Sequence, residues 1–190
     1  FYPIVFGHFN LIFNDYSIIH KTYYYPEIYR SKGAISILTV YDMIHEIYPS
    51  ENKNILRLSR RKKKAVERAD HIICISHSTK NDLLIYYPEV DQSKISVVYL
   101  GVKNEFMRID KLKTNKSLIF VGSRGGYKNF SILLDALDEL SNYSLIIVGG
   151  GELSNQENKR LKNIKYEHLI ECSDEMLNNL YNQSLALIYP

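Results

Sequence analysis

The sequence predicts an α/β protein made of two Rossmann-like domains, each built on a doubly wound parallel sheet. Three observations support this fold class. Short apolar runs, typical of buried strands, alternate with longer amphipathic runs, typical of helices. Several apolar runs end at glycine or at polar side chains, where parallel sheets present their ligand sites. A polar stretch at 103–116 separates two blocks of this alternation, so we expect domains at 1–102 and 117–190 with a linker between them.

The first block contains four expected strands and two expected helices. Strands are placed where apolar residues run together, and helices where apolar residues recur every three or four positions. Ser76 or Ser78 is expected to cap the second helix, and Pro88 to stop it. The expected strands are 17–20, 35–39, 70–76 and 94–100, and the expected helices are 53–69 and 79–87.

The second block opens with the most informative stretch of the chain, residues 117–140. An apolar strand at 117–121 runs into a glycine-rich turn that carries two cations, Arg124 and Lys128, and Asn129 is expected to cap the following helix. Helix N-termini bind anions, and glycines let backbone N–H groups approach a ligand. The turn therefore predicts a phosphate or diphosphate site. The alternative is a plain strand–turn–helix connection with two solvated cations.

The rest of the second block continues the alternation. A second glycine turn, Gly149 to Gly151, follows the next strand and is expected to line the same crevice as the first turn. The expected strands are 143–148, 164–166 and 184–188, the expected helices are 155–161 and 174–182, and a loop is expected at 168–173.

Composition narrows the class of protein. A hydrophobic content of 45% is enough for a packed core, and a net charge of +3 gives no reason to expect a nucleic-acid partner. Cys74 and Cys172 stand far apart, without a CxxC pair or a histidine at ligand spacing, so we expect reduced structural thiols in a cytoplasmic protein and no metal site. The apolar residues 1–13 are too few to span a bilayer and are expected to join the core.

The helix expected at 53–69 carries the strongest charge cluster of the chain, with five consecutive cations at 60–64. A basic stripe of this kind can rest on anionic lipid headgroups at the inner face of a membrane. The alternative is a solvated face, since the opposite side of the helix offers few large apolar anchors. The stripe consists of Arg57, Arg60, Arg61, Lys64 and Arg68.

Polar and ionisable side chains gather after two strands of the first block. His20 ends one strand, and Tyr41, Asp42 and His45 follow the next. Because parallel strands present their sites at their carboxyl ends, we expect these side chains to face a substrate. The alternative is a role in capping or in loop hydrogen bonds.

Six segments, in order along the chain, resemble motifs of family 4 glycosyltransferases. These are retaining sugar transferases with the GT-B architecture of two Rossmann-like domains. The resemblance covers most of the chain beyond Asp15. The segments are ILTVYDMIHEIYP, ADHIICISHSTKNDL, VVYLGVKNEF, LIFVGSRGGYKNFSILLDAL, LIIVGGGEL and LYNQSLALIYP.

The resemblance implies a donor site in the second domain. Arg124 and Lys128 match the cationic pair that holds the diphosphate of a nucleotide-sugar donor, whose negative charge grows as the sugar leaves. This pair takes the place of a metal, and the donor is a substrate, so no cofactor is expected. The other implied donor-binding residues come from the two glycine turns and from a segment that recognises the base. They are Gly122, Ser123, Gly125, Gly126, Gly149, Gly150, Gly151, Leu169 and Ile170.

In the first domain, the resemblance places Asp42 and Tyr41 near the transferred sugar and His20 and His45 on the acceptor side. With Arg124 and Lys128, Asp42 and Tyr41 are the predicted catalytic residues. Tyr41 stands where the family usually has histidine, and because a phenol titrates at about 10, the proton-handling role of that histidine does not carry over. A histidine–tyrosine loop around His20 resembles mannosyltransferase-like members, so the resemblance points to mannose as the sugar and to a glycan or lipid-linked acceptor.

The family pattern also extends beyond these residues at both ends. A pair of glutamates that holds the donor sugar and ribose follows the last segment in the family, and a glycine loop precedes the first. Neither is in the sequence, so we expect both domains to be incomplete and the chain to be a fragment.

Three other functions are open to test. A dinucleotide oxidoreductase needs GxGxxG after its first strand, and neither VGSRGGYKN nor VGGGEL fits. A sugar-nucleotide epimerase shares the GT-B architecture, but the LTVYDM and GYKNF segments are closer to transferases. A non-catalytic sugar-nucleotide-binding fragment is compatible with the missing glutamate pair.

Overall fold

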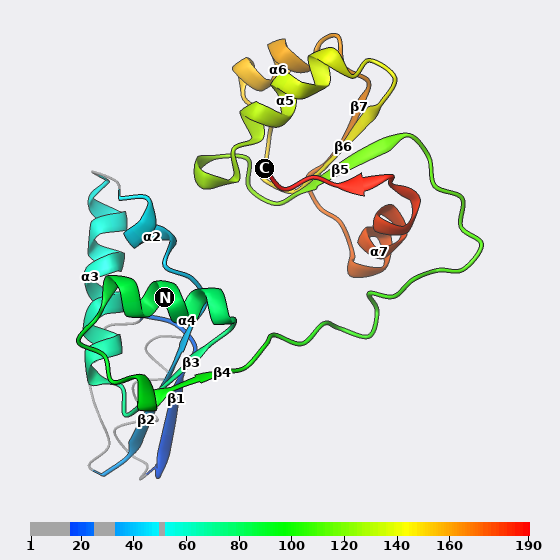
Figure 1. Ribbon diagram of the computed structural model, residues 1–190. Coiled ribbons are helices and arrows are strands. Elements are labelled where there is room, and N and C mark those ends of the chain that lie inside the picture. Colours follow the sequence, from blue (N-terminus) through cyan, green and yellow to red (C-terminus); the bar gives the residue numbers. More distant parts are fainter. Residues whose placement is uncertain (1–15, 25–32, 50–51) are drawn as a thin grey trace. The chain divides into compact units, whose positions relative to one another are not determined.

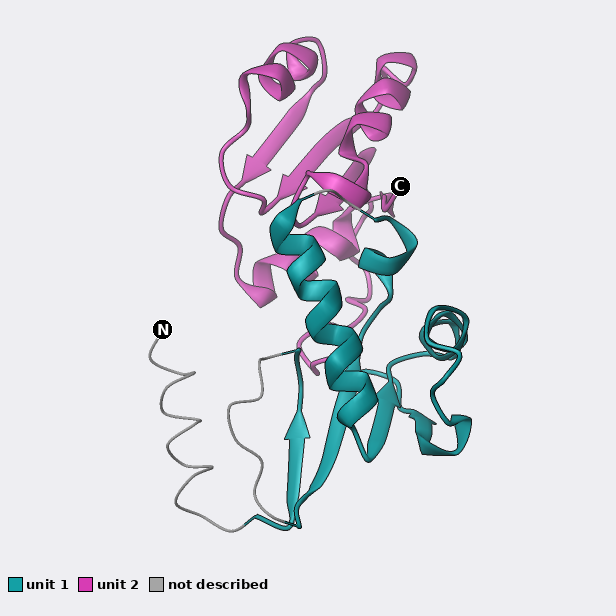
Figure 2. Ribbon diagram, turned by 90° about the vertical axis from the view of Figure 1, so that its left-hand side faces the viewer, with its two compact units in different colours: residues 1–101 teal, residues 102–190 magenta. Residues whose placement is uncertain are grey.

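The computed structural model of the protein describes residues 16–24, 33–49 and 52–190. The core element expected at residues 1–13 lies outside the described residues. The chain divides into two compact units, Phe1–Gly101 and Val102–Pro190, called unit 1 and unit 2 below (Figure 2). Each unit is built on a parallel sheet flanked by helices, which confirms the predicted α/β class.

Unit 1 contains a four-stranded parallel sheet in the order β1-β2-β3-β4 (Figure 1). Its core lies between the sheet and two helices, where Leu38 and Ile72 of the sheet pack with Val66 and Leu83. The strands are β1 Ile18–Lys21, β2 Ile35–Val40, β3 His71–Cys74 and β4 Ile95–Val97. The helices in the described part of unit 1 are α2 Ile44–Ile47, α3 Lys53–Arg68 and α4 His77–Tyr86.

Two predicted boundaries in unit 1 can be compared with the structure. Ser76 caps α4, and its hydroxyl accepts the Thr79 backbone N–H at 3.0 Å, as predicted. The strand predicted at 94–100 is wrong in length, since β4 ends at Val97. Tyr99 and Leu100 beyond it are exposed. Their apolar character suggested a buried strand, but among the described residues β4 pairs with β3 alone, so its end gains little burial.

Unit 2 contains a second parallel sheet in the order β7-β6-β5-β8. The two faces of β5 and β6 are buried in separate clusters, one with α5 and α6 and the other with α7, and Figure 1 shows these helices on opposite sides of the sheet. The strands are β5 Ser117–Val121, β6 Ser144–Val148, β7 Tyr166–Leu169 and β8 Ala186–Leu187. The helices are α5 Phe130–Glu139, α6 Asn155–Leu161 and α7 Asp174–Gln183.

Two predictions for unit 2 are corrected. The strand expected at 164–166 is β7, Tyr166–Leu169, so His168 and Leu169 belong to a strand and not to a loop. Asn129 does precede α5, but among the described residues its side chain makes no cap hydrogen bond, and its backbone is left-handed with φ of 50°. A short 3₁₀ turn, Gly126–Lys128, fills the approach to the helix and places Asn129 in this conformation.

Residues 103–116, all of them described, contain no helix or strand. Their backbone is fastened to α7 by two asparagines. Asn178 Oδ1 accepts the Met107 N–H at 3.1 Å, and Asn182 Oδ1 accepts the Ile109 N–H at 2.8 Å. The segment therefore packs within unit 2, and its role as an interdomain linker stays a prediction.

Candidate functional site

The two glycine turns of unit 2 lie side by side at the carboxyl ends of β5 and β6. The Gly122 N–H donates to the Val148 carbonyl at 2.8 Å, and the Gly149 N–H donates to the Leu169 carbonyl at 2.7 Å. These bonds continue the sheet for one residue past each strand. The structure thus brings the predicted residues of both turns together. The Leu169 carbonyl accepts the Gly149 N–H and so helps to hold the second turn.

Two glycines make room for the two predicted cations. Gly122 has φ of +110°, and a Cβ there would overlap the Lys128 ammonium. Gly150 has φ of +78°, and a Cβ there would lie 2.6 Å from Arg124 Nη1 and 2.9 Å from the Gly122 carbonyl oxygen. Because larger residues rarely adopt these conformations, each glycine is required by its backbone angle as well as by its neighbour.

The hydrogen-bond donors of Arg124 bind groups of unit 2. Its side chain is 5% exposed, and its Nε donates to Glu157 Oε1 at 2.7 Å. Nη1 donates to the Gly149 carbonyl at 2.9 Å, and Nη2 donates to the carbonyls of Gly151 and Glu152 at 3.2 and 2.7 Å. The guanidinium therefore holds the second turn in place, and it reaches a ligand only by exchanging some of these bonds.

Glu157 is a site residue that the sequence analysis missed. Its Oε2 accepts the Ser154 N–H at 2.7 Å, and its own N–H donates to Ser154 Oγ at 3.2 Å, which forms a capping box at the start of α6. Burial favours a raised pKa for Glu157, but hydrogen bonds from Ser154 and Arg124 outweigh it and hold the pKa below its usual value. The Ser-x-x-Glu spacing at 154–157 was the signal that could have found it.

Lys128 is less committed than Arg124. Its Nζ donates to the Val121 carbonyl at 3.5 Å, the outer limit of a hydrogen bond, and lies 5.4 Å from the centre of the Tyr189 ring. The ammonium is half-buried beside the first turn. It is therefore available to an anion with little rearrangement.

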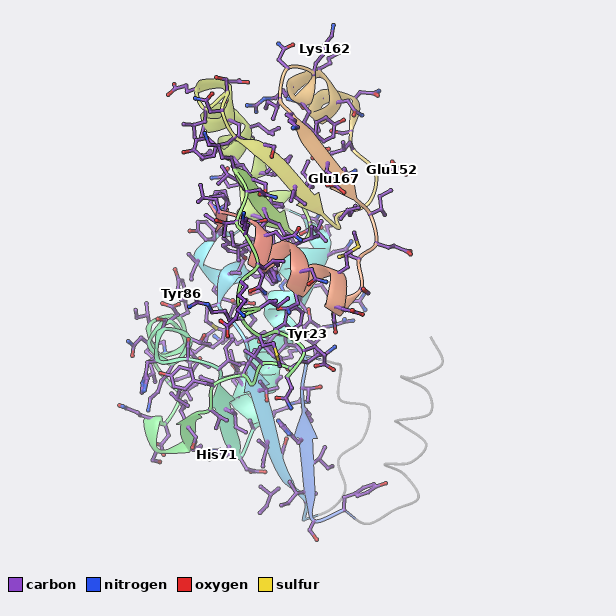
Figure 3. All side chains as sticks on the ribbon, turned by 90° about the vertical axis from the view of Figure 1, so that its right-hand side faces the viewer. Tyr23, His71, Tyr86, Glu152, Lys162 and Glu167 are labelled. Carbon is purple, nitrogen blue, oxygen red and sulfur yellow. The ribbon has the colours of Figure 1, made fainter. Side chains whose placement is uncertain are left out.

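A cavity of about 500 Å³ opens between the start of α5 and the start of α6. Arg124 and Glu157 line it together with the first turn, whereas Lys128 does not. Figure 3 shows Glu152 on the loop between β6 and α6. Its side chain is exposed and does not line the cavity, while its backbone carbonyl accepts a hydrogen bond from Arg124. Other lining residues are Ser123, Gly125, Gly126, Asn129, Gly150, Ser154 and Arg160.

The base-recognition residues expected after β6 lie at the end of β7. His168 Nε2 is 3.5 Å from Arg124 Nη1 and 3.4 Å from the Gly149 carbonyl. Ile170 is 45% exposed just beyond the strand. The described arrangement therefore places this segment against the second glycine turn.

In unit 1, three of the predicted residues share one turn after β2. Asp42 Oδ1 accepts the Ile44 N–H at 3.1 Å, and the Asp42 side chain remains 49% exposed. The Tyr41 carbonyl accepts the Thr79 hydroxyl at 3.1 Å, and His45 is half-buried on α2. His20 is not part of this group, because it lies within β1 and its Nε2 is 2.8 Å from Thr39 Oγ1.

A buried charged pair stands behind this turn, and the sequence analysis missed it. Lys62, which lies within the five-cation run at 60–64, has no exposed surface, and its Nζ is 2.7 Å from Glu46 Oε2. Burial favours a raised pKa for Glu46, but the hydrogen bond and charge of Lys62 outweigh it, so the pKa lies below its usual value. The basic stripe itself is exposed at Arg57, Arg60, Lys64 and Arg68 and half-exposed at Arg61.

Both cysteines are free thiols, as predicted. Burial raises the pKa of Cys74 to about 11, and it raises the pKa of the half-exposed Cys172 to a smaller extent. Across the described residues, no group of three or more His, Cys, Asp or Glu side chains is placed to hold a metal ion. Within the same part of the chain, every helix is too short or too polar to cross a membrane.

Comparison with protein families gives one match, and comparison with solved structures gives several. The model of Glycosyltransferase Family 4 matches residues 6–106. A comparison with curated protein sequences gives no match.

Three solved structures illustrate the likeness in fold. A glycosyltransferase from Rickettsia africae ESF-5 matches 98% of this chain and 54% of its own, with a TM-score of 0.57 and 19% identity. TarM matches 78% of this chain and 31% of its own, with a TM-score of 0.57 and 14% identity. The pneumococcal O-GlcNAc transferase GtfA, solved with UDP and GlcNAc, matches 82% and 33%, with a TM-score of 0.53 and 16% identity. The chain thus spans about a third to a half of these structures, and the low identities establish a shared fold alone.

Proposed function

Since the chain belongs to glycosyltransferase family 4 and has the parallel α/β sheets of GT-B glycosyltransferases, we propose that its protein transfers a sugar from a nucleoside-diphosphate donor to a glycan or lipid-linked acceptor. The observation that carries this proposal is the pair of adjacent glycine turns in unit 2, each shaped around one cation. A nucleoside diphosphate fits this chemistry, and GtfA, similar in fold, was solved with UDP.

In the proposed reaction, unit 2 stabilises the leaving diphosphate. Negative charge grows on that group as the sugar departs, so a fixed cation beside it favours the transition state over the ground state. Lys128 supplies this charge directly from its half-buried position. Arg124 joins it by exchanging carbonyl partners in the second turn for phosphate oxygens, since those partners are neutral and flank Gly150, which lines the cavity.

Unit 1 is proposed to serve the acceptor and the transferred sugar. Asp42 is the strongest candidate there, because its carboxylate is half-exposed at the carboxyl end of the sheet and is oriented by the Ile44 N–H. Tyr41 and His45 flank it in the same turn. The resemblance around His20 supports a hexose, with mannose as the first sugar to test, and family membership supports retention of the anomeric configuration.

The test is nucleotide binding followed by turnover in the full-length protein. Titration calorimetry with UDP and GDP should detect binding of at least one of them, and donor plus acceptor should release it. Lys128→Ala and Arg124→Ala should each raise the barrier by about 2–4 kcal/mol. Lys162→Ala is the matched control, because Figure 3 shows Lys162 at the far end of α6 from Glu152 and its side chain is exposed.

The outcomes separate the alternatives. Undiminished turnover in both cation variants contradicts the assignment of the diphosphate site. Binding without any turnover favours the non-catalytic sugar-nucleotide-binding protein. Absence of binding to UDP, GDP and the remaining common nucleoside diphosphates rejects both functions.

We also propose that the basic stripe on α3 contacts anionic lipid at the inner face of a membrane. Arg57, Arg60, Lys64 and Arg68 are exposed along one helix and attract negative headgroups. The protein should sediment with vesicles containing phosphatidylglycerol and stay behind with pure phosphatidylcholine. The double variant Arg60→Glu/Lys64→Glu should sediment equally little with both kinds of vesicle. Equal sedimentation of the unaltered protein with both kinds of vesicle contradicts the proposal.

A further inference from the structure

Lys62 lies wholly inside unit 1, although it sits in the middle of a run of five cations. Its ammonium donates to Glu46 Oε2 at 2.7 Å and to the Asp42 backbone carbonyl at 3.0 Å, and it lies 3.7 Å from Asp42 Oδ1. One buried cation therefore contacts both the first residue of the turn and a residue of the helix that follows it.

Glu46 gathers donors from two other elements. Its side chain is 6% exposed, and its Oε1 accepts the Ser59 hydroxyl at 2.8 Å and the Tyr87 hydroxyl at 2.9 Å. Ser59 belongs to α3, and Tyr87 is the C-cap of α4. Glu46 thus joins α2 to both helices that flank the sheet.

The turn needs such support because it is short. Helix α2 has four residues. Its N-cap residue, Met43, makes no side-chain hydrogen bond in the described chain, and the Asp42 carboxylate accepts one amide at its start, the Ile44 N–H. A single helical turn is not stable by itself, so tertiary contacts must hold it. A well-packed apolar pair at these two positions would stabilise the fold as well as a buried ion pair or better. The hydrogen bond to the Asp42 carbonyl is what an apolar pair could not supply.

We infer that Lys62 and Glu46 are positioning residues that hold the Asp42–His45 turn in place for the acceptor and the transferred sugar. This inference rests on the proposed function. Neither residue touches substrate, since both are buried behind the turn. Their role is to fix the backbone from which the Asp42 carboxylate and the His45 imidazole project.

The test compares the double variant Lys62→Met/Glu46→Gln with the unaltered full-length protein. The new glutamine amide is neutral, so no buried charge is left alone, and its oxygen still accepts from Ser59 and Tyr87. Lys63→Met is the control, because it makes the same change one residue along α3, in a half-exposed pair with Glu89. Amide hydrogen exchange and steady-state kinetics are measured on all three proteins.

We expect the double variant to keep the slow exchange of β2 and β3. The amides of Ile47 and Tyr48, which donate to the Met43 and Ile44 carbonyls of the turn, should exchange at least about tenfold faster. Its kcat should fall about 10- to 100-fold, because small displacements of reacting groups have effects of this size. The donor KM and the binding of UDP and GDP should stay within about twofold, since unit 2 is untouched. Lys63→Met should change none of these quantities.

Two results overturn the inference: a double variant with normal exchange in the turn, or one with fast exchange and normal kcat. Tyr87→Phe serves if the double variant does not fold, because it keeps both buried charges and removes one of the hydroxyls that hold Glu46. It should then show faster turn exchange and reduced kcat, in a smaller degree, and unchanged values overturn the inference. If the unaltered protein has no turnover with any donor, the proposed function fails, while hydrogen exchange still decides whether the pair positions the turn.

Discussion

Each unit places one buried cation against one carboxylate near the end of its sheet, and the two pairs differ in what they hold. The N–O distance is 2.7 Å in both Lys62–Glu46 and Arg124–Glu157. In unit 1 the side chains are 0% and 6% exposed, whereas in unit 2 they are 5% and 20% exposed. Lys62 reaches its turn from a flanking helix, whereas Arg124 lies in the first glycine turn and fastens the second.

The difference shows two ways of fixing a loop. A lysine ammonium has three donors and acts nearly as a point charge, so Lys62 ties one carboxylate and one carbonyl in a dry interior. Arginine presents five donors in a plane, so Arg124 can tie three carbonyls and a carboxylate at once. The first arrangement is shielded from competing water, because both side chains are buried. The second borders a cavity, where a ligand can compete for the same donors.

The largest effect is expected when the unit 1 pair is broken on one side. Lys62→Met leaves the Glu46 carboxylate buried without its cation, which should destabilise unit 1 by about 3–5 kcal/mol. The chain contains no tryptophan, so we would measure the exchange of β2 and β3 amides and not fluorescence. Unit 2 should keep its exchange rates. A loss below about 1 kcal/mol, the size typical of exposed pairs, contradicts the importance given to burial.

A smaller effect is expected from closing the space that unit 2 leaves for Arg124. Gly150→Ala adds a methyl group against Arg124 Nη1 and the Gly122 carbonyl at a left-handed backbone position, and should cost about 3 kcal/mol in unit 2. Gly151→Ala is the matched comparison, since φ is +69° there and the added atom meets nothing within 4 Å. It should cost about 1 kcal/mol. Equal losses in the two variants would mean that backbone strain alone matters.

Acid should weaken both pairs, each in its own unit. The pKa of Glu46 and that of Glu157 lie below the ordinary value of 4.5, because their donors outweigh burial. A lowered pKa in the folded state gives stability that is complete above pH 4.5 and is lost as the pH falls through the lowered value. We would measure hydrogen exchange of both units between pH 5 and 3. Glu46→Gln should reduce the loss of stability with acid in unit 1 alone, and Glu157→Gln should reduce it in unit 2 alone. Reversed or shared effects count against this assignment.

The smallest effect comes from two serine caps that look alike. Ser76→Ala in unit 1 and Ser154→Ala in unit 2 each remove a hydroxyl that caps a helix, which should cost about 1 kcal/mol in either unit. Ser154 Oγ also accepts the N–H of Glu157, the residue that holds Arg124, so loss of this hydroxyl should weaken binding of the nucleoside diphosphate several-fold. Ser76→Ala should leave that affinity unchanged. Calorimetry with the same nucleotide measures both affinities. Equal affinities of the two variants would mean that the Ser154 cap does not support Arg124.

Local sequence patterns were enough for much of the fold. Residues 117–121 are β5 and residues 155–161 are α6, with the predicted boundaries, because a run buried on both faces and a capped polar helix are each set by nearby residues. Strand β7 was misplaced because its YEHL sequence is half polar. It lies at the edge of the sheet, where pairing with β6, and not apolar content, defines the strand.

The candidate site was predictable in kind but not in its connections. Glycine-rich turns after apolar strands are visible in sequence, and so are the cations within them. The burial of Lys62 was not visible, because its partner Glu46 lies sixteen positions away and its neighbours in the run are solvated. Arg124 was expected to face a ligand. Its bonds to the second glycine turn were not visible either, because that turn begins twenty-five positions later. Both are tertiary contacts, which periodicity and spacing do not encode.

The two cysteines give each unit its own chemical reporter. Thiolate is the form that reacts with maleimides, and with a pKa of about 11 only about one Cys74 thiol in ten thousand is ionised at neutral pH. Cys74 is also buried in the core of unit 1, while Cys172 is half-exposed in unit 2. A brief exposure to reagent should therefore mark unit 2 alone, and any second label records an opening of the core around β3. Mass spectrometry of the labelled protein can thus measure how often the core of unit 1 opens, and the labelling of Cys172 in unit 2 serves as the internal reference.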